Sequence, residues 1–386
     1  MAEHDDSILF ALLRSGVSGT PLLETERAEF DPEKLPALSA LAKRHDLEHL
    51  LALGLRQNGL TSEGTKPLEK SLFLAVFRHQ RLEAAQNALC AALEQGEIPF
   101  IPLKGAVLRR LYPEPWMRTS CDIDILVRQE DAERAAALLE ARCGCIRQGT
   151  GAHDISLCTP NKTHLELHYT LMEKAQAGRA ADVLETVWHR ALLRNGCSFH
   201  YEMPDDLFYF YHIAHMAKHI TIGGCGIRPF LDLWILEKME TLEPENRDVL
   251  LEQGGLLKFA RVARDLCRGW FENGSMDSVA RQLEEYILHG GVYGSHDNHI
   301  AVQQQKRGGW LRYLLSKVFL PFEIIKFHYP VLRKHPWLMP VMQVRRWCKL
   351  IFCGHVRRVS RQLTYGRRIT SEEEKNTKLF LENVGL

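Results

Sequence analysis

The sequence feature that most constrains this chain is a short apolar stretch interrupted by two acidic residues. Residues 121–127 read CDIDILV, a pattern in which Asp122 and Asp124 alternate with Ile123 and Ile125. Because successive side chains of a strand point to opposite faces, both carboxylates lie on one face and both isoleucines on the other. Neighbouring carboxylates in a sheet both stay ionised only when positive charge lies beside them. The stretch therefore predicts a strand with one buried face and one cation-binding face.

A second predicted strand supplies a third carboxylate. Residues 163–169 read THLELHY, so Glu166 alternates with two leucines. If this segment is a neighbour of the first strand, Glu166 lies beside Asp122 and Asp124. Carboxylate oxygens suit Mg²⁺, and phosphate chemistry that uses two metal ions commonly needs a third carboxylate. The three residues then form an Asp-x-Asp plus Glu triad suited to magnesium.

Basic residues upstream of the aspartates are candidates for phosphate binding. The segment PLKG at 102–105 ends a predicted strand and opens a helix. Gly105 lets backbone amides approach a phosphate, the helix start adds a partial positive charge, and Lys104 adds a full one. Arg118 precedes Asp122 by four residues, and its guanidinium suits a phosphate chain. On spacing alone, an ordinary surface lysine followed by a helix-start glycine explains the Lys-Gly pair equally well.

Composition narrows the class of protein. With 386 residues, of which 45% are hydrophobic and 25% charged, the chain is typical of a globular protein with two or three domains. The net charge of +1 excludes a strongly basic or acidic chain, so affinity for nucleic acid or membranes must come from local patches. Ten cysteines without Cys-x-x-Cys pairs and an acidic N-terminus lead us to expect a reduced, cytoplasmic protein. No stretch reaches the roughly 18 uninterrupted apolar residues of a spanning helix.

Periodicity predicts an α+β fold, with a small mixed sheet between helical segments. The expected strands are 99–103, 121–127, 153–159 and 163–169, with a helix at 129–144 that ends at Gly144. The expected organisation is a helical N-terminal segment at 1–95, an α/β core at 96–203, a helical domain closing the cleft at 204–288, a linker or loop at 289–308, and a C-terminal helical region with a basic stretch at 309–386.

These motifs occur together in one known family. The run IPFIPLKGAVLRRLYPEPWMRTSCDIDILVRQED, followed by the Glu166 strand and by HIAHMAKHITIGGCGIRPFLDL, resembles the uncharacterised nucleotidyltransferase family of the DNA polymerase β-like superfamily. The likeness covers about residues 95–240 well and extends more loosely to about 350. It departs from the commoner superfamily pattern in having Lys-Gly in place of Gly-Ser and 16 residues between that glycine and the first aspartate.

The resemblance implies a function and a role for each motif. It implies Mg²⁺-dependent transfer of a nucleoside monophosphate from a nucleoside triphosphate, with ATP as the expected donor, to a hydroxyl acceptor. In that superfamily the Asp-x-Asp pair binds two Mg²⁺ ions, a third carboxylate completes the site, and the glycine turn holds the triphosphate. By position these roles fall on Asp122, Asp124, Glu166 and Gly105, with Lys104 added by the Lys-Gly form. Glu166 is also expected to take the proton of the acceptor hydroxyl.

A later helical segment can form a second wall of the nucleotide cleft. It carries Lys218, Arg228 and Asp232, with Arg228 as the candidate phosphate ligand. An internal ion pair explains the same residues equally well.

Four histidines have spacings that metal sites use. His164 and His168 share the predicted face of Glu166, either as nitrogen ligands or, more commonly, as hydrogen-bonded neighbours. His215 and His219 lie four residues apart on a helix but lack the intervening acid of a His-Glu-x-x-His zinc motif. The second pair, His215 and His219, is better explained as core histidines or as histidines that hold other residues of a site in place.

A basic amphipathic stretch at 341–368 leaves further functions open. It carries eight arginines and lysines, no acidic residue, and interleaved apolar side chains such as Trp347. Such a stretch can bind RNA, an anionic membrane surface or an acidic partner, or it can be an ordinary helix face exposed to solvent. The alternatives to the enzyme are therefore a catalytically silent nucleotide-binding or interaction module, or an RNA-binding or RNA-modifying factor. The sequence leaves the acceptor open among a sugar, an antibiotic, a protein hydroxyl and an RNA end.

Overall fold

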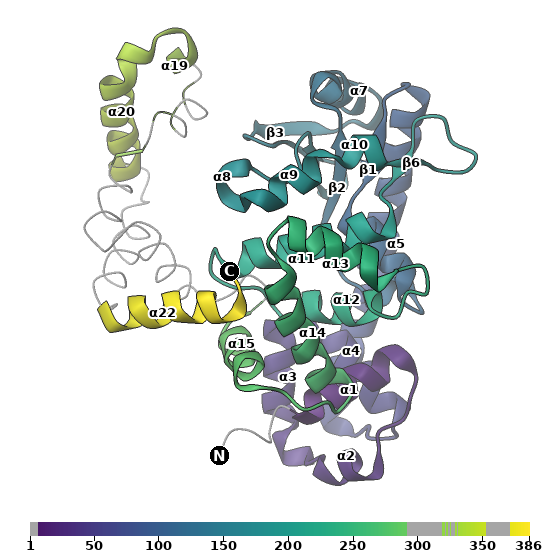
Figure 1. The fold of residues 1–386 in the computed structure, drawn as a ribbon. Helices are drawn as coiled ribbons and strands as arrows, with labels where there is room; N and C mark the ends of the chain where they lie inside the picture. The colour runs from purple at the N-terminus through teal and green to yellow at the C-terminus, as the bar shows by residue number, and fades with distance from the viewer. Residues whose placement is uncertain are drawn as a thin grey trace.

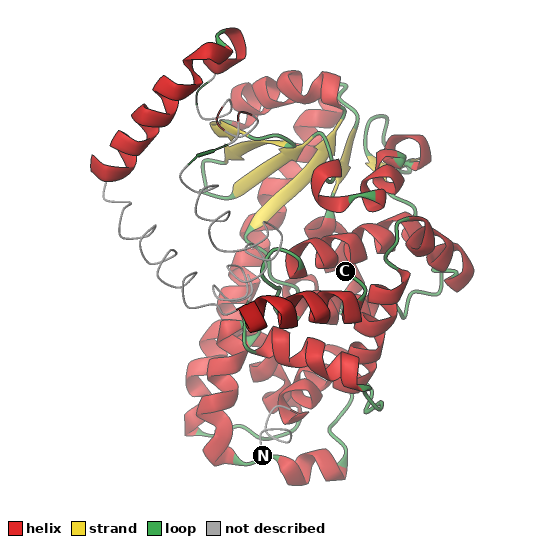
Figure 2. Cartoon of the chain, turned by 60° about the vertical axis from the view of Figure 1, so that its left-hand side comes forward, coloured by secondary structure: helices red, strands yellow, loops and turns green. Residues whose placement is uncertain are grey.

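The computed structural model describes residues 7–291, 331–352 and 371–386, with isolated residues between 319 and 329. Within these ranges the chain forms a mainly helical body and one five-stranded mixed sheet (Figures 1 and 2), which confirms the predicted α+β class. Residues 292–308 of the predicted linker and 353–368 of the basic stretch lie outside the described residues.

The sheet has the order β1-β2-β5-β4-β3. Its strands are β1 (Phe100–Pro102), β2 (Asp122–Val127), β3 (Ile146–Thr150), β4 (Asp154–Cys158) and β5 (His164–His168). Only β2 and β5 run parallel, whereas every other neighbouring pair is antiparallel. Strand β3 was not predicted, because IRQGT is a polar, mostly exposed edge strand with an irregular register between Arg147 and Gly149.

The register between β2 and β5 determines which side chains meet. Asp124 lies opposite Glu166, and Asp122 lies opposite His164. The parallel strands are in phase, so their acidic residues project from the same face, while Ile123 and Ile125 of β2 and Leu165 and Leu167 of β5 project from the other. The sheet therefore has one apolar and one polar face.

Two helices cover the apolar face. They are α5 (Lys66–Gln95) and α7 (Ala132–Cys143), and α7 ends at Gly144, whose φ of +64° favours glycine. The core between helices and sheet consists of buried aliphatic side chains of both, including Leu89, Leu93, Ala135, Leu139, Ile123, Ile125, Leu165 and Leu167.

The remaining helices form a second, larger core. Helix α1 (Ser7–Ser18) packs on α4 (Glu48–Gln57) and α14 (Leu257–Phe271), and the ring of Phe10 stacks on Trp270 with centroids 4.3 Å apart. The N-terminal helices and the helices after residue 204 therefore share one hydrophobic core. The other described helices are α2 (Glu24–Glu29), α3 (Leu35–Arg44), α6 (Lys104–Leu108), α8 (Lys174–Ala177), α9 (Arg179–Glu185), α10 (Val187–Arg190), α11 (Asp205–Ile220), α12 (Arg228–Leu236), α13 (Pro244–Gln253), α15 (Ser278–Leu288), α19 (Val331–Lys334), α20 (Met339–Phe352) and α22 (Ser371–Val384), and a short hairpin pairs β6 (Leu192–Leu193) with β7 (Tyr201–Glu202). Among the described helices, none combines the length and apolarity needed to cross a bilayer.

Two buried histidines in this body lead us to predict acid sensitivity. The Nδ1 atom of His45 accepts a hydrogen bond from the Ile227 N–H at 3.3 Å, and Nε2 of His212 donates to the Pro229 carbonyl at 2.9 Å. Burial lowers the pKa of each imidazole to about 4. The unfolded chain therefore binds more protons below the ordinary histidine pKa, so this stability is present above about pH 6.5 and is lost as the pH falls toward 4.

We expect His45→Gln to reduce the difference in unfolding free energy between pH 7 and pH 5 by about 2 kcal/mol. Urea unfolding at the two pH values measures that difference. The exposed His189 provides the control, because His189→Gln should leave the pH dependence as in the unsubstituted protein. Equal pH dependence in both variants would show that folding does not lower the pKa of His45.

Candidate active site

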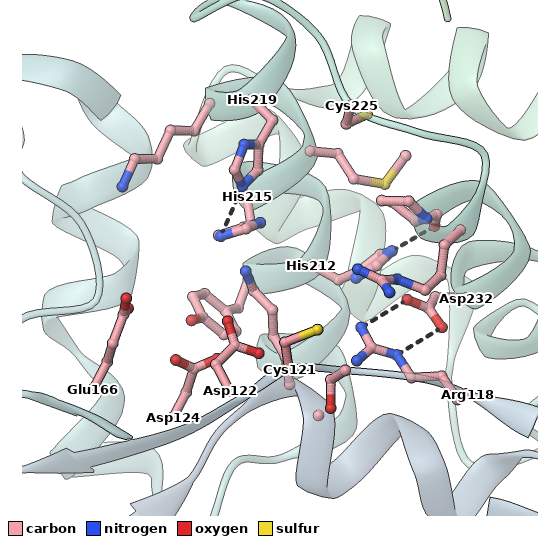
Figure 3. Close-up of a pocket in the computed structure, with 18 of the residues that line it drawn as sticks. Arg118, Cys121, Asp122, Asp124, Glu166, His212, His215, His219, Cys225 and Asp232 are labelled. Atoms are coloured by element: carbon pink, nitrogen blue, oxygen red, sulfur yellow. Dashed lines mark hydrogen bonds and ion pairs between the residues drawn. The ribbon is translucent and has the colours of Figure 1, made fainter. Parts of the chain in front are cut away.

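The polar face of the sheet lines a cavity of about 700 Å³. Strands β2 and β5 supply one wall, and α11 and α12 supply much of the other (Figure 3). The eight residues singled out in the sequence all line it: Lys104, Gly105, Arg118, Asp122, Asp124, Glu166, Lys218 and Arg228. One cavity therefore brings together side chains that are up to 124 positions apart in the chain.

Three acids occupy the strand side of this cavity. Figure 3 shows Asp122 beside Asp124, with Glu166 on the neighbouring strand. Among the described residues, one group of three or more acidic, histidine or cysteine side chains has all its donor atoms within 4.8 Å, and it consists of Asp124, Glu166 and His168. Asp122 lies next to this group on the same strand face but is not part of it.

His168 lies between two of the acids. Its Nε2 atom is 3.3 Å from Asp124 Oδ1 and 3.3 Å from Glu166 Oε2. Burial by itself lowers the pKa of His168, but the hydrogen bonds that its ring donates to both carboxylates outweigh this effect and raise the pKa to about 9. The same contact with His168 is the main reason that the pKa of Glu166 falls to about 2. His168 is therefore a hydrogen-bonded neighbour with a positive charge near neutral pH.

Asp122 lacks such a partner. The surrounding protein and the nearby charges of Asp124 and Glu166 raise its pKa above the ordinary aspartate value. The ionised form of Asp122 is thus less favourable than that of an ordinary aspartate, and added positive charge would stabilise it. A divalent cation coordinated by oxygen atoms is the kind of group that this side of the cavity fits.

Among the residues described, Lys104 is one of two lysines that line the cavity. It begins α6, and its Nζ atom lies 5.2 Å above the ring of Tyr211 from α11. Burial lowers the pKa of Lys104 to about 7, although Asp124 acts in the opposite direction. Within the described part of the chain, neither Lys104 nor Lys218 has a carboxylate within the 4 Å of an ion pair. Both lysines are therefore free to bind an anion in the cavity.

Two histidines of α11 adjoin these lysines. The Nε2 atoms of His215 and His219 are 3.2 Å apart, so one ring donates a hydrogen bond to the other. Burial, together with the positive charge of Lys104, lowers the pKa of His219 to about 4 and that of His215 further. Both rings are neutral near pH 7, and the adjacent lysines make this wall unfavourable for a metal cation.

The two arginines predicted for the site, which line the cavity together with Arg78, bind protein groups. Arg118 donates from Nε and Nη2 to the carboxylate of Asp232, at 3.3 and 3.1 Å. Arg228 donates from Nη1 to the Thr119 carbonyl at 3.0 Å and lies 3.4 Å from Asp46. Both side chains line the cavity, and the contacts with Asp232 use much of the donor capacity of Arg118. Arg228 donates from Nη1, whereas its buried Nε atom has no hydrogen-bond partner among the described residues.

Gly105 is required by this crowded arrangement. A Cβ atom at this position would lie 3.0 Å from Arg109 Nη1 and 3.4 Å from Ser120 Oγ. The glycine therefore permits close packing at the start of α6 as well as backbone access from the cavity.

Comparison with known proteins identifies a family. No curated protein and no solved structure matches the chain. The family model described as "Uncharacterised nucleotidyltransferase" matches residues 31–272. The match begins before residue 95, where the resemblance seen in the sequence starts, and ends before residue 350, to which that resemblance extends loosely. The match covers well over half of the chain and includes all of the cavity-lining residues. This chain therefore belongs to the uncharacterised nucleotidyltransferase family.

Proposed function

We propose that this protein transfers a nucleoside monophosphate from a nucleoside triphosphate, with ATP as the expected donor, to a hydroxyl acceptor. The observation that carries the proposal is the charge arrangement of the cavity, in which Asp122, Asp124 and Glu166 lie on the strand side and Lys104 and Lys218 contribute cations. A nucleotide with bound metal has a matching arrangement, because its metal ions need oxygen ligands and its phosphates need cations.

The carboxylates fit magnesium by their chemistry. They offer hard oxygen donors, and because burial and the charges of Asp124 and Glu166 raise the pKa of Asp122, an added cation would favour its ionised form. Asp122, Asp124 and Glu166 would hold the magnesium ions. By analogy with the superfamily, the expected number of ions is two. When bound, Mg²⁺ neutralises phosphate charge and lowers the pKa of an acceptor hydroxyl.

The protein's own side chains bind and orient the reactants. In the proposed reaction, the acceptor oxygen forms a bond to the α-phosphorus while its O–H bond breaks and the proton passes to water. The bond from that phosphorus to the bridging oxygen breaks, and pyrophosphate leaves. Lys104 and Lys218 bind the phosphates that leave, and Gly105 leaves room for them. Arg118 and Arg228 fix the cavity wall, since their guanidinium groups are held by Asp232 and Thr119.

Glu166 is less suited than Asp122 to accept the hydroxyl proton. With a pKa of about 2 it is a weak base, so its proposed role is to bind the cation. This differs from the sequence-based expectation, which gave Glu166 the additional role of proton acceptor.

The test of the proposed activity combines binding with product detection. Thermal shift with ATP, CTP, GTP and UTP, each with and without Mg²⁺, should show stabilisation that needs both nucleotide and metal. Mass spectrometry of cell extract incubated with the protein, Mg²⁺ and isotopically labelled nucleoside triphosphates should then reveal a labelled adduct that names base and acceptor. Absence of any labelled adduct with all four nucleotides would refute the transfer activity.

One observation favours a second candidate, a nucleotide-binding module without turnover. The charge of His168 already compensates Asp124 and Glu166, so part of the site is neutralised without metal. Nucleotide binding that is independent of Mg²⁺ and yields no product would favour this module.

Lys104 provides a prediction about phosphate binding. We expect Lys104→Met to raise the KM for the nucleotide about tenfold to a hundredfold, the equivalent of the roughly 1.5–3 kcal/mol of a hydrogen bond to a charged group. Steady-state kinetics with the identified acceptor measure this change. Lys70→Met on the exposed surface of α5 should leave KM unchanged, and an unchanged KM in both variants would remove Lys104 from the phosphate site.

A further inference from the structure

Helix α20 has an uncovered apolar stripe. Trp337, in the turn that leads into the helix, is 74% exposed, and Val341 and Val344 are 56% and 52% exposed. Their spacing of four and three residues places them on one side of the helix. Figures 1 and 2 both draw α20 apart from the helical body. No described residue covers this stripe.

The other side of α20 is packed. Gln343 is 4% exposed, and its Nε2 atom donates to the Leu320 carbonyl at 2.6 Å. The ring of Trp347 makes an edge-to-face contact with Phe319 at 5.3 Å between centroids. The helix therefore has an inner side held by its own chain and an outer side with three exposed apolar residues.

The sequence around α20 carries charges of one sign. Between Glu323 and Glu372 the sequence contains no acidic residue and 11 lysines and arginines. On α20 itself, Arg345 follows Val344 directly and is exposed. A partner of this surface must combine negative charge with an apolar interior.

We propose that the outer side of α20 binds the surface of an anionic lipid membrane. An interfacial helix inserts its apolar side at the boundary between headgroups and acyl chains, and its basic residues bind anionic headgroups. Tryptophan is enriched at that depth, which suits Trp337 at one end of the stripe.

Two other occupants fit less well. Single-stranded RNA could stack a base on Trp337 but would leave Val341 and Val344 uncovered, although the basic residues would attract phosphates. A second copy of α20 would bring basic residues against basic residues without any acid to compensate them. The membrane is the partner that uses both the apolar stripe and the positive charge. This inference is independent of the proposed transfer activity.

The test is co-sedimentation of the full-length protein with phosphatidylcholine vesicles that contain or lack phosphatidylserine. We expect binding only with phosphatidylserine, weakened by added salt, and a loss of about tenfold or more in the Val341→Asp, Val344→Asp double variant. Val249→Asp on α13 is the matched control, because Val249 is also 52% exposed. Lipids brominated near the headgroup should quench tryptophan fluorescence, and Trp337→Phe should remove part of that quenching.

Several results would overturn the proposal. These are no binding to either vesicle, equal loss in the double variant and in Val249→Asp, or binding to RNA alone that the double variant retains. Self-association that the double variant abolishes, without any vesicle binding, would assign the stripe to a second copy. Circular dichroism melts of the variants show whether a loss reflects unfolding. Because no nucleotide is added, failure of this test leaves the transfer activity unaffected.

Discussion

Replacing Asp122 by asparagine is expected to abolish nucleotidyl transfer without destabilising the fold. The change preserves shape but removes one of the three carboxylates proposed to hold magnesium, so we expect kcat to fall by about a thousandfold or more. The thermal stability of the metal-free protein should not fall in this variant. Its surroundings and the charges of Asp124 and Glu166 raise the pKa of Asp122, so the substitution relieves repulsion. We therefore expect an unchanged or slightly higher Tm.

Product formation and thermal melting in the presence of a chelator measure the two effects. Asp182→Asn is the control, because Asp182 is an exposed aspartate that pairs with Lys174 outside the cavity. It should change neither activity nor Tm beyond the small effect of a surface ion pair. Retained transfer in Asp122→Asn would refute the metal site, whereas a large fall in Tm would make Asp122 a structural residue.

The strands around the site could be predicted because their side chains alternate strictly. In β2 and β5 every second residue is apolar and buried, so the period of two was visible in the sequence. The same alternation placed Asp122 and Asp124 on one side of β2. It also led to the expectation that positive charge must compensate them.

The pairing between strands could not be derived in this way. That Asp124 lies opposite Glu166 depends on the order and register of β2 and β5, and two strands with the same alternation are compatible with several registers. The bridging position of His168 follows from that register. The sequence indicated only that His168 shares a face with Glu166. Strand β3 was missed for a related reason, since an exposed polar edge strand has no buried side to produce a period.

Contacts between distant segments were also beyond the sequence. Arg118 appeared to be a phosphate ligand because it precedes the aspartates, yet its guanidinium is paired with Asp232, 114 positions later. The hydroxyl of Tyr112 donates to the same carboxylate at 2.8 Å. Local pattern cannot show which acid will be buried beside an arginine, because that depends on how α12 packs against the chain before β2. The structure therefore leaves two roles for Arg118, one structural and one in phosphate binding.

Asp232→Ala separates these roles, and we expect it to lower the free energy of unfolding by about 3–5 kcal/mol. Asp232 is 1% exposed, and although burial by itself would raise its pKa, Arg118 outweighs that effect and lowers it. Removing this carboxylate leaves the guanidinium of Arg118 buried without its counter-charge, which is the costly outcome. Urea unfolding at pH 7 measures the loss. Glu202→Ala, which breaks the exposed pair with Arg110, should cost less than about 1 kcal/mol.

The double variant Arg118→Met, Asp232→Leu removes both charges and should recover much of the lost stability, since apolar residues can replace a buried ion pair. If this variant folds, its nucleotide affinity tests Arg118 directly. Unchanged affinity would show that Arg118 acts only through the wall that it forms with Asp232, whereas a tenfold or greater loss in the stable variant would place its guanidinium on the phosphates. A loss of less than about 1 kcal/mol in Asp232→Ala would contradict the structural role, because it would mean that Arg118 finds water or another partner when Asp232 is gone.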